Sequence, residues 1–229
     1  MLLSWLDGDL MVMFRLHYGL FLGALLFSAS LFSEGVESLV KTTPSFLHNT
    51  ADTDSEHQLT FPLNGDNHIS LVVTLPNDLK REKEQKDSSN PNQPFIFFHG
   101  NFTFITLSST TFNSDQPDEN LLNPSFDPIT LTLDSVTNTM KKETEVTVLE
   151  NGKKDNSGYR EGYRIVKRYS AQGDKLDVAY IYVVCGPHDA VIIIYTMRVH
   201  GSETVDTLVQ KLREAMKAQV KIVNKSTTN

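Results

Sequence analysis

The sequence predicts an α+β protein in which helices sandwich an antiparallel β-sheet, and three observations lead to this class. The segments Leu176–Cys185 and 190–199 are apolar on both faces and rich in β-branched and aromatic residues, which is typical of strands inside a covered sheet. The turn residues between them, at 186–189, predict an antiparallel hairpin. Beyond Gly201 the spacing of apolar residues changes from two to about 3.6, which predicts an amphipathic helix.

The C-terminal helix is expected to begin after Ser202, a suitable N-cap, with Glu203 near the positive end of the helix dipole. Its apolar stripe consists of Val205, Leu208, Val209, Leu212, Met216 and Val220. In the first strand of the hairpin, even-numbered positions from Leu176 to Val184 form one apolar face and odd-numbered positions from Ala179 to Cys185 form the other. The sheet therefore needs cover on both sides.

The segments before residue 129 predict shorter elements. A strand at 68–75 ends at Pro76, and two further strands, at 95–98 and 102–107, lie on either side of a turn at His99-Gly100. Between these strands, the charged residues 77–92 are expected to form a short solvated helix and a loop. Residues 108–128 are polar with three prolines, and we expect a long loop there.

The middle of the chain predicts a helix followed by strands. Asp134 is the expected N-cap of a short helix at 135–143. A strand is expected at 145–149, a turn at Asn151-Gly152 and a solvated loop at 153–158. The alternation of Tyr163 and Ile165 with charged residues predicts one more strand, which lies nearer an edge of the sheet than the two strands of the hairpin.

The N-terminal region carries an uncharged apolar run at 16–32, preceded by Arg15. This pattern, with small residues at 28–30, predicts an export signal cleaved near Ser30 or Ser33. Asp7 and Asp9 fit an export signal poorly, which indicates a start at Met11 or Met13. The alternatives are an uncleaved membrane anchor and a buried helix. We expect an N-terminal extension and signal at 1–33, a flexible leader at 34–67, one α+β domain at 68–220 and a disordered tail at 221–229.

The composition limits the possible functions. A formal net charge of −7 without a basic stripe argues against binding to nucleic acid. A single cysteine, Cys185, excludes an internal disulfide framework and a multi-cysteine zinc site. Because Cys185 lies at the end of a central strand, we expect a buried, inert thiol.

Three groups of residues are candidate sites. His99-Gly100 is similar to the His-Gly of an oxyanion hole, but no Gly-x-Ser-x-Gly segment accompanies it, so an ordinary turn is expected. Cys185 and His188 could form a thiol–imidazole pair, but no third, orienting group is evident, so a structural cysteine is expected. The third group could hold a metal, but its spacing matches no ligand motif: His57, His68, Asp52, Asp54 and Asp66.

The order of elements from residue 69 onward resembles the PsbP-like fold, which is shared by the lumenal photosystem II accessory protein, the Ran-binding Mog protein and DcrB-type bacterial envelope proteins. Four segments carry the likeness: 71–76, 158–169, the hairpin of 179–185 with 190–197, and the helix from Ser202. The resemblance covers about two-thirds of the chain, although the loop at 108–128 departs from compact versions. It implies a sheet sandwiched by helices and an accessory or binding role instead of catalysis, and it brings no site motif.

These observations predict an exported, non-enzymatic accessory or protein-binding module with no catalytic, cofactor-binding or metal-binding residues. Its partner is expected to be another protein, and it contacts the membrane only if the apolar run is retained. Tyr159 and Tyr163 are expected to be exposed, and the loop residues Phe112, Leu121, Leu122 and Phe126 either contact a partner or fold back onto the sheet. Sequons at Asn101 and Asn224 match glycosylation acceptors. The alternatives are a membrane-anchored envelope component, a small hydrolase using His99, a thiol enzyme using Cys185, and a binder of a small apolar ligand between sheet and helix.

Overall fold

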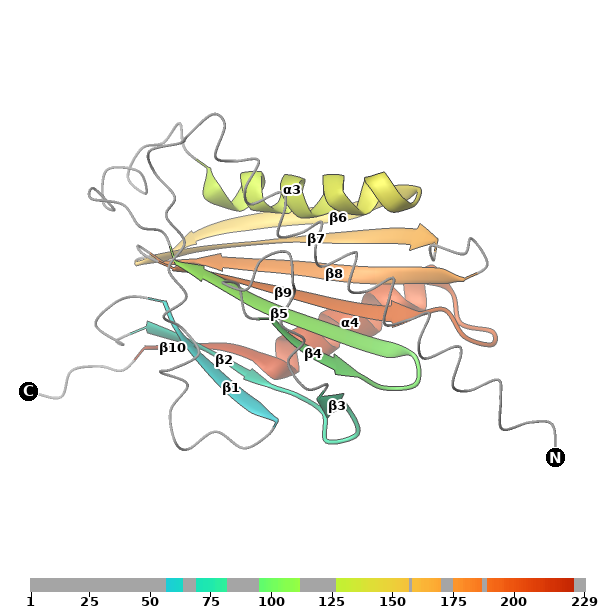
Figure 1. Ribbon diagram of the computed structural model, residues 1–229, viewed down its shortest axis with the longest axis horizontal. Coiled ribbons are helices and arrows are strands. Elements are labelled where there is room, and N and C mark those ends of the chain that lie inside the picture. Colours follow the sequence, from blue (N-terminus) through green and yellow to red (C-terminus); the bar gives the residue numbers. More distant parts are fainter. Residues whose placement is uncertain are drawn as a thin grey trace, which may run out of the picture.

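The computed structural model describes residues 57–63, 69–81, 95–111, 127–156, 158–169, 175–186 and 189–224. In these ranges the chain forms two antiparallel sheets and two helices, α3 (Pro128–Glu143) and α4 (Val205–Gln219) (Figure 1). The larger sheet has the order β3-β4-β5-β9-β8-β7-β6, and the smaller has the order β1-β2-β10. The strands are β1 (Gln58–Pro62), β2 (Ile69–Thr74), β3 (Lys80–Arg81), β4 (Phe95–His99), β5 (Thr103–Thr111), β6 (Val146–Asn156), β7 (Tyr159–Tyr169), β8 (Leu176–Cys185), β9 (Asp189–Arg198) and β10 (Val220–Asn224).

The predicted hairpin of two-faced strands is confirmed at the centre of the larger sheet. β8 and β9 pair antiparallel, from Asp177 with Arg198 to Cys185 with Ala190. From Ala179 to Cys185, the odd-numbered residues of β8 pack with α3. Val178 and Val184 pack in a second core cluster with the buried residues of α4. Because neighbouring residues of a strand point to opposite faces, the two helices cover opposite sides of this sheet, as Figure 1 shows. The α+β class is therefore confirmed, and β7 lies second from an edge, as predicted.

Two segments that were expected to lie outside the domain are strands. β1 falls within the predicted leader and β10 begins at the last residue of the predicted domain and runs through the predicted tail, and they pair with the two edges of β2. Leu59 and Phe61 of β1 are 5% and 3% exposed, because their alternation directs both side chains into the core. The expected leader and tail are thus wrong for 58–62 and 221–224. β2 has a partner strand on each side and is therefore the central strand of the smaller sheet.

Both helix starts differ from the expected ones. α3 begins at Pro128, and its N-cap is Asp127, whose Oδ1 accepts the Thr130 N–H at 3.0 Å. Proline suits the first helical position because its missing N–H would have no helical partner there. Asp134 lies inside the helix instead of capping it. α4 is capped by Thr204, which accepts the N–H of Thr207 at 3.2 Å, and not by Ser202.

The predicted turn at Asn151-Gly152 is wrong, since both residues lie inside the eleven-residue strand β6. The chain reverses after Asn156, where Gly158 has a φ of 85°, a conformation that glycine adopts readily. A β-bulge between Val148 and Glu150 shifts the register of β6 with β7. β5 likewise extends to Thr111, into the predicted loop at 108–128, because it continues to pair with β9.

Several predictions fall outside the described residues. They concern the apolar run at 16–32, the leader before residue 57, the loop at 112–126, most of the charged segment 77–92, and the side chains of His68 and His188. Among the residues that the structure describes, neither helix is long and apolar enough to cross a membrane.

Candidate functional site

Four tyrosines gather on the α4 side of β7 and β8. Tyr163 lies opposite Tyr182 in the register of the two strands, and its ring stacks on Tyr180 with centroids 5.2 Å apart. Tyr159 lies on the same face of β7, two strand periods from Tyr163. All four are half-buried and pack against the core cluster under α4, so Tyr159 and Tyr163 are less exposed than the sequence indicated. We call this group the tyrosine cluster.

Two glutamates order the hydroxyl groups of the tyrosine cluster. Tyr163 donates its O–H to Oε1 of Glu150 at 2.5 Å, and Arg213 of α4 donates to Oε2 of the same carboxylate. Tyr182 donates its O–H to Glu161, which also accepts from Nδ2 of Asn156 at 3.1 Å. The cluster therefore joins β6, β7, β8 and α4 through paired aromatic and charged groups.

The electrostatics of the tyrosine cluster favour neutral phenols. The hydrogen bond to Glu150 raises the pKa of Tyr163, and burial raises the pKa values of Tyr180 and Tyr182. The hydrogen bonds from Tyr163 and Arg213 lower the pKa of Glu150, so this carboxylate stays ionised. A tyrosine that acts as a base or nucleophile needs a lowered pKa. The arrangement thus suits non-covalent contacts through ring faces, the Arg213 guanidinium and carboxylate oxygens.

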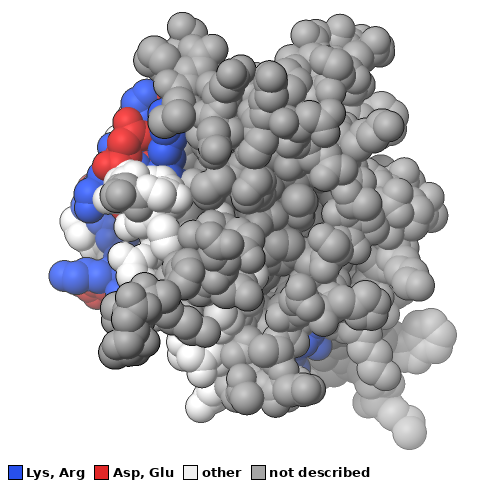
Figure 2. All heavy atoms as spheres, turned by 90° about the vertical axis from the view of Figure 1, so that its left-hand side faces the viewer, with Lys and Arg blue, Asp and Glu red and all other residues white. Residues whose placement is uncertain are grey.

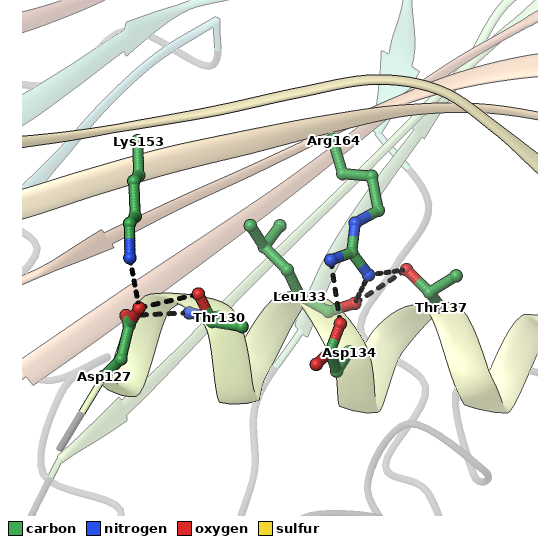
Figure 3. A network of polar contacts seen from close by, with 7 residues as sticks. All are labelled: Asp127, Thr130, Leu133, Asp134, Thr137, Lys153 and Arg164. Atoms are coloured by element: carbon green, nitrogen blue, oxygen red, sulfur yellow. Dashed lines mark hydrogen bonds and ion pairs between the residues drawn. The ribbon is translucent and has the colours of Figure 1, made fainter. Parts of the chain in front are cut away.

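A second polar network fastens α3 to the opposite face of the sheet (Figure 3). Lys153 of β6 pairs with Asp127 at 2.6 Å, at the start of the helix. Arg164 of β7 pairs with Asp134 at 2.8 Å and donates to the backbone oxygen of Leu133 at 3.2 Å. Burial acts to raise the pKa of Asp127, but hydrogen bonds from Lys153 and Thr130 lower it to about 2. Apart from the buried Nε of Arg164, which has no hydrogen-bond partner among the described residues, these groups satisfy one another, so we interpret this network as structural.

The turn at His99 is ordinary, as predicted. His99 ends β4 opposite Phe104 and its ring stacks on Phe97, with centroids 6.1 Å apart. Gly100 donates its N–H to the backbone oxygen of Thr103 at 2.8 Å, which closes the turn between the two strands. His99 and Gly100 thus belong to the tight turn that connects β4 and β5.

Cys185 is fully buried at the end of β8, and burial raises the pKa of its thiol to about 12. The predicted burial of this thiol is confirmed. His57 is the one member of the possible metal group that the structure describes, and the described residues contain no group of three or more His, Cys, Asp and Glu side chains able to hold a metal ion.

The turn between β6 and β7 carries charges of both signs. Lys153, Lys154, Asp155 and Arg160 lie near it, and Asp155 pairs with Arg160 at 3.4 Å. Figure 2 shows blue and red side chains side by side along one margin of this end of the molecule. The described part of this face has no broad positively charged surface of the kind that binds nucleic acid.

Sequence reasoning missed Glu150, Glu161 and Arg213 as members of a site. One signal was present, since the alternation Tyr159, Glu161, Tyr163 places all three on one face of a strand. Arg213 gave no signal, because its contact with Glu150 joins residues 63 positions apart.

The comparisons with known proteins concern the fold. No protein-family model matches the chain, and no curated protein matches its sequence. The solved structures include that of cyanobacterial PsbP (CyanoP) from Synechocystis sp. PCC 6803. This chain is similar to it in fold. The match covers 77% of this chain and 98% of CyanoP, with 10% sequence identity and a TM-score of 0.47.

Proposed function

We propose that this chain is a non-enzymatic accessory module of the cell envelope or the secreted fraction, and that it binds another protein through the tyrosine cluster and Arg213. The observation that carries the proposal is the contact of Arg213 with Glu150 beside Tyr163 at the surface, where the Arg213 side chain is 41% exposed and that of Glu150 30%. Tyrosine and arginine are the residue types enriched in the centres of protein interfaces.

The ordering of this surface supports a binding role. Tyr163 is held by its stack on Tyr180 and by its bond to Glu150, and the same carboxylate holds Arg213. Side chains that are ordered before a partner arrives lose less conformational entropy on binding. An ordered aromatic surface with paired charges therefore favours recognition of a folded protein that presents polar and apolar groups.

Export is proposed from the sequence. The apolar run at 16–32 follows a basic residue and ends near small residues, as in a cleaved signal peptide. A retained membrane anchor is the alternative, because about 17 apolar residues is the shortest length that crosses a bilayer. The enzyme alternatives have less support. A thiol enzyme needs an accessible, acidified cysteine, whereas Cys185 is buried with a raised pKa.

The test combines intact mass, compartment and affinity capture. The mature chain is recovered from its own fraction, its N-terminus is determined by mass, and proteins bound to it are quantified for wild type and two variants. Arg213→Ala removes the exposed cation beside Tyr163. Lys211→Ala is the matched control, since it removes another exposed α4 cation that pairs with a glutamate, Glu203.

A soluble extracytoplasmic chain that begins near residue 31 or 34 and captures a defined protein in stoichiometric amount supports the proposal, provided that Arg213→Ala loses this protein and Lys211→Ala retains it. An unprocessed chain in the membrane fraction would instead establish the anchored alternative. A cytoplasmic chain would overturn export, and equal capture by both variants would remove the tyrosine cluster from the interface.

A further inference from the structure

β6 is an edge strand with an unprotected first half. Among the described residues it pairs with β7 on one side and with no strand on the other. Its second half carries Lys153 and Lys154, and lysines discourage pairing at an open edge. The first half has no charge and no proline from Val146 to Leu149, and Val148 and Leu149 are 40% and 39% exposed. Open backbone groups and exposed apolar side chains therefore coincide in one short segment.

The residues of this segment are self-complementary. Val146, Thr147 and Val148 read the same in both directions. In an antiparallel pair of two copies about a twofold axis at Thr147, each Val146 faces Val148 of the other copy, and the two threonines face each other. Valine pairs and threonine pairs are favourable cross-strand neighbours. The flanking residues Glu145 and Leu149 also face each other, so no like charges are opposed between 145 and 149.

The valines of such a pair would continue an existing core. Val146 packs against the core cluster under α3, and Val148 lies opposite the buried Val166 of β7. A second copy would cover the exposed side of Val148 with valine from the neighbouring strand. The bulge after Val148 ends the regular part of the strand, which limits the pairing to the apolar half and keeps Lys153 and Lys154 out of the contact.

We propose that two copies of this chain associate through the first half of β6, in antiparallel register centred on Thr147, so that their larger sheets join edge to edge. A twofold contact in which each copy presents the same residues is the commonest way for identical chains to associate. The contact lies on the β6 edge, whereas the proposed protein partner occupies the tyrosine cluster and Arg213, so either proposal can fail without the other.

The test measures the mass of the purified chain by light scattering across a concentration series, with all variants in one buffer. Wild type is expected to reach twice the mass of one chain. Thr147→Lys and Thr147→Glu each place like charges opposite each other at the axis, so each is expected to weaken association about tenfold or more. Thr147 is exposed, so both variants should fold. An equimolar mixture of the two is expected to restore the dimer, because lysine then faces glutamate.

Leu131→Lys is the control, because Leu131 is likewise an exposed apolar residue, 39% exposed, but belongs to α3 and not to β6. It is expected to leave the dimer intact. The proposal is overturned if wild type is a monomer at every concentration. It is also overturned if Leu131→Lys dissociates the dimer as much as the Thr147 variants do, or if the two mixed Thr147 variants do not associate. A wild-type monomer that captures another protein in a Thr147-dependent manner would place a foreign strand on this edge and would overturn it as well.

Discussion

Gly152 of β6 lies directly opposite Tyr163 of β7, and the tyrosine ring occupies the place of the missing side chain. A Cβ on Gly152 would lie 2.5 Å from Cε1 of Tyr163. The ring can therefore lie across β6, where it stacks on Tyr180 and bonds to Glu150. The geometry of the tyrosine cluster depends on this glycine.

The neighbouring Gly162 has the same effect on the other face of the sheet. A Cβ there would lie 2.2 Å from Cγ2 of Ile129, so the glycine allows the first turn of α3 to approach the strand closely. Two glycines in adjacent register positions of β6 and β7 thus admit an aromatic ring on one face and a helix on the other.

Gly152→Ala is expected to lower the free energy of unfolding by about 1–3 kcal/mol, because the new methyl group displaces the Tyr163 ring from its stack. Urea unfolding measures the change. The same substitution in a Tyr163→Ala background is the control and is expected to have little effect, since the ring is absent. Equal losses in both backgrounds would show that the ring contact is not the cause.

Asp127→Asn is expected to lower stability in a pH-dependent way. The folded pKa of Asp127 is about 2, below the ordinary value of 3.8, so its ionised form stabilises the fold above about pH 4 and this contribution is lost as pH falls toward 2. The asparagine retains a cap but loses the ion pair with Lys153, a difference of about 0.5–1 kcal/mol at neutral pH. Urea unfolding between pH 2 and pH 6 should show wild type and variant converge at the acidic end. A constant difference across this range would contradict the assignment.

Asp177→Ala is expected to destabilise the protein by about 3–5 kcal/mol, because it removes the carboxylate that neutralises the buried Arg198 guanidinium. Asp177 is 1% exposed and accepts from Nε of Arg198 at 2.8 Å. The matched control is Asp155→Ala, which breaks a pair in which the aspartate is 80% exposed and should cost about 0–1 kcal/mol. Thermal unfolding compares the two, and similar losses would mean that burial does not set the strength of this pair.

Cys185 is expected to resist thiol reagents in the folded protein and to react rapidly in urea. Its side chain is fully buried, and its pKa of about 12 leaves little thiolate at neutral pH. Labelling rates with a thiol-specific chromogenic reagent at pH 7 and pH 8.5 measure this. Fast, complete labelling of the native chain would reopen the thiol-enzyme hypothesis.

The sequence was most informative where the spacing of apolar residues within one segment predicts which side chains are buried. The two faces of β8 follow from its alternation, and the buried residues of α4, Leu208, Leu212 and Met216, follow from helical spacing. The sequence was misleading at two places. In the first, tertiary contacts overruled a local turn signal, and in the second, one local cap signal prevailed over another. Asn151-Gly152 is a strong turn signal, but the Tyr163 ring and the pairing with β7 hold both residues in a strand. Asp134 has the chemistry of a cap, but Asp127 followed by proline starts the helix about two turns earlier.

By itself, the sequence determined the α+β class, the central hairpin, the C-terminal helix and the burial of Cys185, because each depends on the polarity of neighbours along the chain. Only the tertiary structure decided that β1 and β10 flank β2, that Glu150 joins Tyr163 to Arg213, and that β6 stands at an edge. These features depend on which distant segments share a sheet or a surface. The packing of the whole chain determines which group lies beside a strand edge or a carboxylate, and a local sequence pattern does not contain this information.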